Sequence, residues 1–161
     1  MEEDQMGVAI TLREYLSDHA ASYETIAHPR TASALQTSEV SHVPGDRMVK
    51  SVLLGDDDSY VMALIPASHR LDIEHVNDTI GRELDLMPET EVAGAFTDCE
   101  VGSIPPVGEA YGIETLVEPC LLDEPEVFFE SGDHGVLIRM SGEQFRELLG
   151  DAARTEMSHH L

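Results

Sequence analysis

The stretch "RMVKSVLLGDDDSYVMALIP", residues 47–66, decides the fold of this chain. Two apolar, β-prone runs, 47–55 and 59–66, flank the acidic tip "DDD", a pattern typical of a β-hairpin. Alternation gives the first strand two faces, with Val49, Ser51 and Leu53 on one and Met48, Lys50, Val52 and Leu54 on the other. Lys50, the only lysine in the sequence, therefore lies in mid-strand among apolar neighbours.

Helices and further strands are predicted on both sides of this hairpin. Helical spacing and capping signals indicate helices at 11–20, 31–40, 71–81, 87–96 and 141–150. Short apolar runs indicate strands at 22–28, 112–119, 126–131 and 135–140. The residues expected at helix ends are Thr11, Leu71 or Asp72, Gly81, Pro88, Ser141 and Gly150.

This order of elements predicts an α+β, or mixed α/β, fold in which helices surround a largely antiparallel central sheet. We expect one domain over residues 1–161, because this length suits a single core and no linker or repeat interrupts it. The core of the domain is expected at about 11–149. Both termini are expected to be frayed, with His159-His160 in the C-terminal tail.

The composition is strongly acidic but otherwise that of a folded protein. Hydrophobic residues make up 42% of the chain, so the acidity does not indicate disorder. The formal net charge of −23 should repel nucleic acid and anionic membranes. Two interpretations stay open: an acidic mesophilic protein, or one adapted to concentrated salt, where a Debye length of about 3 Å removes long-range repulsion.

The sequence also predicts a compartment. Cys99 and Cys120 lie far apart and form no metal-type pair, which favours a reducing environment. The opening "MEEDQMGVAI" has neither the basic region nor the apolar region of a signal peptide. No apolar run approaches the roughly 18 residues that a membrane span requires. We therefore expect a soluble, cytoplasmic protein that does not bind membranes.

Two features are candidates for chemistry. In one interpretation, Lys50 is a strand residue whose stem packs while its ammonium reaches water. In the other, Lys50 is a compact cation that approaches a carbonyl or phosphate oxygen where the planar fork of arginine does not fit. The loop "GSIPPVG", residues 102–108, can hold backbone N–H groups toward a ligand oxygen. An ordinary connection uses the same residue types.

The histidines give no metal-binding pattern. His28, His69 and His134, taken singly, are most simply surface histidines or hydrogen-bonded core histidines. His69 and His75 are too loosely spaced for a metal pair, and no HxxH, HExxH or CxxC spacing occurs. Phosphate-binding glycine loops and the GxSxG motif are absent as well.

Taken in order, several segments resemble the YbaK/ProX superfamily of aminoacyl-tRNA deacylases, also called the prolyl-tRNA synthetase insertion-domain-like family. The segments are "AHPRTASA", "GDRMVKSVLL", "YVMALIPASHRLD", "GSIPPVG" and "SGDHGVLIRM". The resemblance implies the fold of that family and a free-standing trans-editing hydrolase. Such an enzyme cleaves the ester between a wrong amino acid and the 3′ end of a tRNA, without metal or cofactor. The implied substrate is tRNA-Pro carrying alanine, cysteine or serine, and the implied protein partner is prolyl-tRNA synthetase.

The resemblance also implies roles for particular residues. Lys50 matches the functional strand lysine of the family, which holds the terminal adenosine or phosphate and the ester in place. Gly102 and Pro106 match the G-x-x-x-P loop, whose backbone faces the scissile carbonyl. Ser51 matches a site linked to substrate choice, and His134 matches a histidine that bounds the amino-acid pocket. The other residues predicted to bind substrate are Ser103, Ile104, Gly108 and His28.

The sequence departs from the family in two ways. Basic surface that would grip tRNA is missing, and Ser51 replaces the asparagine of alanine-selective members. Two other functions therefore stay open beside the hydrolase. One is a non-catalytic module that binds a nucleotide or a synthetase, and the other is a regulatory protein that uses its acidic face on a synthetase surface.

Overall fold

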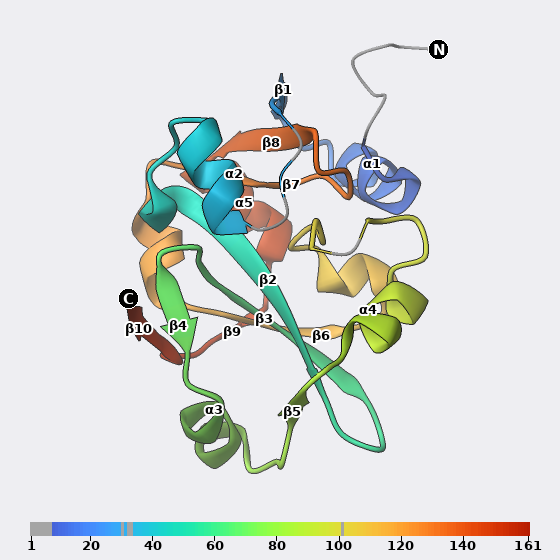
Figure 1. Ribbon diagram of the computed structural model, residues 1–161, viewed down its shortest axis with the longest axis vertical. Helices are drawn as coiled ribbons and strands as arrows, with labels where there is room; N and C mark the ends of the chain where they lie inside the picture. Colours follow the sequence, from blue (N-terminus) through green and yellow to red (C-terminus); the bar gives the residue numbers. More distant parts are fainter. Residues whose placement is uncertain (1–7, 30, 32–33, 101) are drawn as a thin grey trace.

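A computed structural model describes residues 8–29, 31, 34–100 and 102–161 (Figure 1). The opening stretch and part of "AHPRTASA" fall outside these residues. The α-helices are α1 (Ile10–Asp18), α2 (Ala34–Val40), α3 (Ile73–Ile80), α4 (Glu89–Ala95) and α5 (Gly142–Leu149). Short 3-10 helices are η2 (Gly45–Arg47), η3 (Gly108–Tyr111) and η4 (Pro119–Asp123). The strands are β1 (Glu24–Ala27), β2 (Met48–Gly55), β3 (Tyr60–Pro66), β4 (His69–Leu71), β5 (Asp85–Leu86), β6 (Glu114–Val117), β7 (Glu126–Glu130), β8 (Val136–Ser141), β9 (Ala153–Arg154) and β10 (Ser158–His160).

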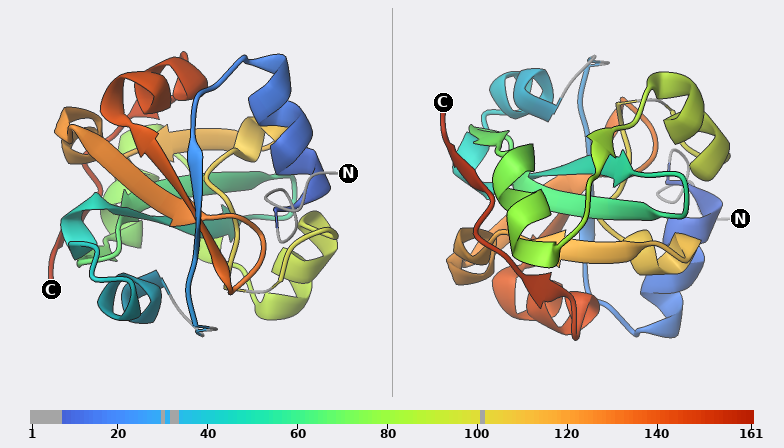
Figure 2. Two further views of the ribbon diagram at one scale, coloured as in Figure 1. Left: turned by 90° about the horizontal axis from the view of Figure 1, so that it is seen from above. Right: turned by 90° about the horizontal axis from the view of Figure 1, so that it is seen from below.

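An eight-stranded sheet in the order β1-β8-β7-β2-β3-β6-β9, with β5 beside β2, organises the molecule. The pairs β1–β8, β7–β8, β2–β3 and β2–β5 are antiparallel, and the pairs β2–β7, β3–β6 and β6–β9 are parallel. The long β2–β3 hairpin crosses the middle of the molecule, with α3 beyond one face of it (Figures 1 and 2). The predicted mixed α/β fold with a mostly antiparallel central sheet is confirmed.

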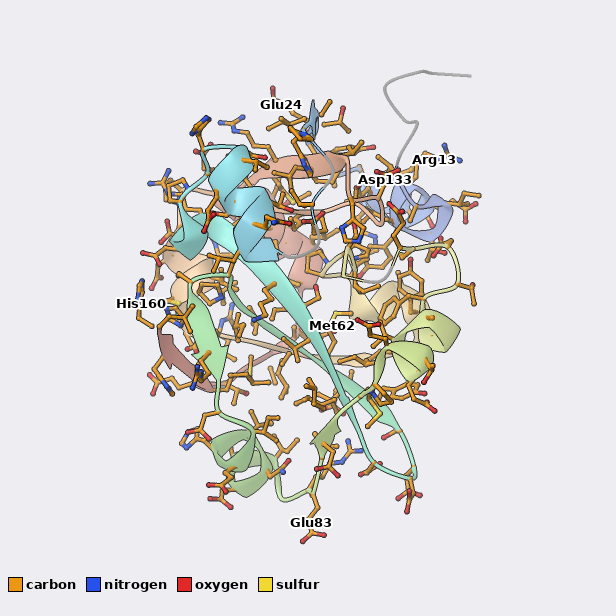
Figure 3. All side chains as sticks on the ribbon, viewed as in Figure 1. Arg13, Glu24, Met62, Glu83, Asp133 and His160 are labelled. Atoms are coloured by element: carbon orange, nitrogen blue, oxygen red, sulfur yellow. The ribbon has the colours of Figure 1, made fainter. Side chains whose placement is uncertain are left out.

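The hairpin is buried on both faces, as its apolar runs predict. Met62 and Leu64 belong to the cluster that α1 and α5 complete, and Met62 lies in the middle of the molecule in Figure 3. Val61 and Ile65 point to the other face, where they join Val76 of α3. Because both faces of β3 are covered, β2 and β3 are held rigidly along their length, and so are the residues that β2 presents.

Several helix ends lie where the sequence predicts them. Asp72 caps α3 by accepting a hydrogen bond from the backbone N–H of His75, and Gly81 ends it with a left-handed φ of +69°. Ser141 caps α5 through the N–H of Gln144, and Gly150 follows the last turn. Pro88 immediately precedes α4.

Two expectations are wrong. Thr11 does not cap α1, because the helix begins at Ile10 and the N–H of Thr11 donates to the carboxylate of Asp98 (2.8 Å). The C-terminal tail is not frayed: β10 pairs with β4, which places His160 opposite His69. The reason is that the short β4 offers a free edge whose backbone groups the tail satisfies.

Candidate functional site

A cavity of about 720 Å³ lies beside the middle of β2. On that edge, Met48 and Val49 pair with β7, whereas Leu54 and Gly55 pair with β5. On this edge, within the described residues, no strand pairs with the segment 50–52 between these two ladders, whereas β3 pairs with the same segment on the opposite edge. The sheet is therefore interrupted at the position of Lys50, and the cavity opens at this interruption.

Lys50 and Arg70 are cations in the lining of this cavity. Lys50 is half-buried and Arg70 is exposed. In the described part of the chain, neither side chain forms an ion pair. Other arginines are bound to carboxylates, for example Arg82 to Asp56 at 2.8 Å. Two positive charges of a strongly acidic protein are thus left available at one cavity.

Gly102 and Ile104 line the same cavity from the loop 102–108. Gly102 adopts a φ of +86°, which favours glycine. Ser103, which lies between Gly102 and Ile104, anchors the loop through its backbone. The N–H of Ser103 donates to the carbonyl of Glu100 (3.1 Å), and the carbonyl of Ser103 accepts from the N–H of Gly132 (2.9 Å). The N–H groups of Gly102 and Ile104 have no acceptor among the described residues. A firmly anchored loop thus carries two free donors, an arrangement that suits a ligand oxygen.

Glu130, the last residue of β7, contributes a carboxyl group to the lining. Only 3% of it is exposed, and its Oε2 accepts a hydrogen bond from Ser103 Oγ (3.3 Å). Burial, together with the charge of Asp133, raises the pKa of Glu130 to about 7, although hydrogen bonds from Thr37 and Ser103 act in the opposite direction. Its Oε1 is buried and has no hydrogen-bond partner in the described part of the chain.

Glu130 was not predicted as a site residue from the sequence. In "EVFFES" the alternation of a strand places Glu130 on the face of Glu126 and Phe128, so the pattern predicts a solvated carboxyl. The structure alone shows that this carboxyl is buried, which makes it a candidate for function. Ser51 also lines the cavity, and its buried Oγ likewise has no hydrogen-bond partner among the described residues. Apolar side chains, among them Met62, Met87 and Val92, complete the wall.

Other predicted site residues lie elsewhere. Pro106 and Gly108 line a second cavity of about 460 Å³, beside α1. Ser103, within the loop, is fully buried. His134 is 9% exposed, and its backbone N–H donates to the carboxylate of Glu100 (2.8 Å). His28 follows β1, where its backbone N–H donates to the carbonyl of Gly135 (2.9 Å).

The structure therefore brings Lys50, Ser51, Gly102 and Ile104 to one cavity, and the other predicted residues do not line it. The roles implied for His28 and His134 stay predictions. Among the described residues, no group of three or more His, Cys, Asp or Glu side chains is arranged to hold a metal ion. In the same residues, none of the helices has the length and apolar character needed to span a bilayer.

Comparison with known proteins gives matches in family, sequence and structure. A family described as aminoacyl-tRNA editing domain matches residues 28–148. A proline–tRNA ligase of Geobacillus thermodenitrificans (strain NG80-2) is 27% identical over 117 residues, which cover 71% of this chain and 20% of the ligase. A proline–tRNA ligase of Bacillus cereus (strain G9842) is 25% identical over 103 residues, or 63% of this chain and 18% of the ligase. The chain thus spans about a fifth of the length of these curated relatives.

Solved structures share the fold across nearly the whole chain. The crystal structure of a protein proposed as a trans-editing enzyme for prolyl tRNA synthetase has a TM-score of 0.80 and 20% identity, covering 94% of this chain and 99% of that one. A hypothetical protein of known structure has a TM-score of 0.81 and 22% identity, covering 92% of this chain and 99% of that one. At 20% and 22% identity, the similarity to these structures shows a shared fold and nothing further.

Proposed function

Because this chain belongs to the aminoacyl-tRNA editing domain family, we propose that it hydrolyses the ester of mischarged aminoacyl-tRNA at the cavity beside β2. The proposed substrate is tRNA-Pro that carries alanine, cysteine or serine, and the protein acts on it in trans. Residues 1–161 form a single editing domain in this proposal, working in the cytoplasm and with prolyl-tRNA synthetase as a partner. The observation that carries the proposal is that Lys50 lines the same cavity as Gly102 and Ile104, whose N–H groups have no acceptor among the described residues.

The reaction requires water to attack the ester carbonyl carbon. A bond forms between that carbon and the water oxygen, the bond to the ribose oxygen breaks, and the ribose oxygen takes up a proton. The products are a free amino acid and a tRNA with a free terminal hydroxyl. In the tetrahedral intermediate the carbonyl oxygen becomes an oxyanion, which preorganised donors stabilise.

The N–H groups of Gly102 and Ile104 and the ammonium of Lys50 supply these donors. Removal of one donor from such a site typically slows the reaction about a hundredfold to a thousandfold. We assign no metal to the reaction, because these groups can supply the positive charge that the oxyanion needs. An ammonium approaches one oxygen as a point charge, whereas a guanidinium needs room for a planar fork. This difference accounts for a lysine at position 50 in a chain whose other basic residues are arginines.

Binding of tRNA to a chain with a net charge of −23 is a further requirement. Lys50 and Arg70 offer local positive charge at the cavity, where the 3′ end enters in this proposal. Repulsion from the rest of the surface declines as salt screens it. The docking of the tRNA body therefore depends on salt or on a synthetase that carries part of the contact.

Loss of the ester from mischarged tRNA tests this proposal. The protein is incubated with tRNA-Pro carrying alanine, serine or cysteine, and with correctly charged prolyl-tRNA, at low and at high salt. We expect hydrolysis of at least one mischarged species well above the spontaneous rate, and slower hydrolysis of prolyl-tRNA. Absence of turnover on all three at every salt concentration would overturn the hydrolase and favour a non-catalytic binding module.

A further inference from the structure

Glu130 has no role in the reaction described above, yet its environment is costly. Its carboxyl is almost completely buried, and Oε1 has no hydrogen-bond partner in the described part of the chain. A buried acceptor without a donor lowers stability, and a buried charge without a counter-charge lowers it further. Such a group calls for an explanation, and a ligand that completes its hydrogen bonds is one.

Within the residues that the structure describes, no group donates to Oε1 of Glu130. The parallel register pairs Met48 with Phe128 and Val49 with Phe129, so that Lys50 and Glu130 follow next on neighbouring strands. No ion pair joins Lys50 to Glu130 in the structure, and both side chains line the cavity. Oε1 thus lacks a donor among the described residues, and a ligand in the cavity can supply one.

The lining of the cavity holds hydrogen-bond donors and acceptors, and of its two glutamate carboxyl groups Glu130 is buried whereas Glu89 is exposed. Lys50 and the N–H groups of Gly102 and Ile104 are donors, which match the oxygens of an ester or a phosphate. Glu130 is an acceptor and matches a donor of the ligand. An aminoacyl ester offers two donors close to its carbonyl, the α-ammonium and the neighbouring ribose hydroxyl. Only the ammonium also neutralises a buried carboxylate.

The position of Glu130 fits the α-ammonium. The hydrogen bond from Ser103 Oγ ties the carboxyl to the loop residue that separates the two free N–H groups. In the substrate, the α-ammonium is attached to the carbon next to the carbonyl. A donor loop for the carbonyl oxygen and an acceptor for the ammonium are thus adjacent in the protein, as the two groups are in the ester.

We propose that Glu130 is the positioning residue for the α-ammonium of the aminoacyl ester, which donates a hydrogen bond to Oε1. This inference rests on the proposed function and adds a specificity to it. The site selects esters of amino acids with a free amino group, and it rejects acyl esters in which that group is blocked or replaced. Peptidyl-tRNA is excluded by the same contact, so that growing chains are not hydrolysed.

Two non-hydrolysable probes test the contact without any turnover. They are adenosine analogues whose 3′ position carries an alanyl or a lactyl group through an amide, and they differ only in an α-ammonium and an α-hydroxyl. Binding of each probe is measured by calorimetry on the wild type, on Glu130→Gln, and on Arg154→Ala. The last is the matched control, because Arg154 is exposed on β9 and does not line the cavity.

We expect the wild type and Arg154→Ala to bind the alanyl probe at least roughly tenfold more tightly than the lactyl probe, the range of a hydrogen bond to a charged group. Glu130→Gln should bind the two probes within about threefold of each other. Equal binding by the wild type would overturn the inference, and this comparison needs no variant. An undiminished preference in Glu130→Gln would also overturn it. If the preference is present but no mischarged tRNA is hydrolysed, the proposed hydrolase fails while the ammonium contact stands.

Discussion

Replacement of Glu130 by glutamine should stabilise the protein at alkaline pH. Burial raises the pKa of this carboxyl from 4.5 to about 7. In the unfolded chain the carboxyl loses its proton near pH 4.5, and in the folded protein it keeps the proton up to about pH 7. The folded state therefore binds more protons between these values, and the contribution of Glu130 to stability falls as pH rises through this window.

The size of the effect follows from the two pKa values. At about 1.36 kcal/mol for each pH unit, the ionised carboxylate lowers the free energy of unfolding by about 3 kcal/mol above pH 7. Glutamine has the same shape, accepts from Ser103 and carries no charge. The gain in the free energy of unfolding from Glu130→Gln should therefore be about 2–3 kcal/mol larger at pH 8 than at pH 5. For a chain of this size, this difference corresponds to roughly 5–10 °C in Tm.

Thermal unfolding followed by circular dichroism at pH 5 and pH 8 measures this difference. Glu156→Gln, at an exposed carboxyl, is the matched control. A gain from Glu130→Gln that is the same at both pH values would refute the assignment of a buried, proton-binding carboxyl. So would a loss of stability at pH 8.

Three further predictions concern the loop, the buried histidine and the charge. Gly102→Ala should lower deacylation about a hundredfold or more and Tm by only a few degrees, because a Cβ strains the φ of +86° and shifts the free N–H groups; a collapse of Tm together with activity would make the loop structural. His134→Ala should change the ratio of the rates on alanyl-, seryl- and cysteinyl-tRNA more than it changes Tm, whereas equal loss on all three would argue against a role in selectivity. Activity should hold or rise between about 50 and 200 mM salt, because the net charge of −23 is screened; a steep loss over this range is the usual response of nucleic-acid binding and would contradict adaptation to salt.

The sequence predicts those parts of the fold that depend on local signals. The β2–β3 hairpin, the Asp72 cap with Gly81 at the other end of α3, and the Ser141 cap of α5 all follow from residues close together in the chain. The family expected from the ordered segments is confirmed by the editing-domain match over residues 28–148.

Features that depend on distant partners were not predicted. The N–H of Thr11 is satisfied by Asp98, which is 87 positions away, and no spacing rule reaches that far. The two- and three-residue strands β5, β9 and β10 have no periodicity of their own, and they exist because an edge of another strand is free. His159-His160 is thereby drawn into β10.

In the candidate site, too, the residues with a local sequence signal were predicted, and those that depend on tertiary contacts were not. Lys50 and Gly102 were predicted from the rarity of lysine and from the glycine loop, and the structure brings them to one cavity. The loop sequence does not show that Pro106 turns toward a second cavity, because the direction of a loop is set by its anchors, here Glu100 and Gly132. Desolvation of Glu130 arises from the helix, strand and loop that meet around it and is therefore a tertiary property.

The deacylation rate of Lys50 variants tests most directly whether the ester is hydrolysed at the cavity beside β2. The rate on the preferred mischarged tRNA-Pro is measured for the wild type, Lys50→Ala, Lys50→Arg and the control Arg154→Ala. We predict that Lys50→Ala loses about a hundredfold or more, that Lys50→Arg fails nearly as badly because the fork does not replace a point charge, and that Arg154→Ala retains the wild-type rate. Full activity in Lys50→Arg, or a Lys50→Ala variant as active as Arg154→Ala, would contradict the account.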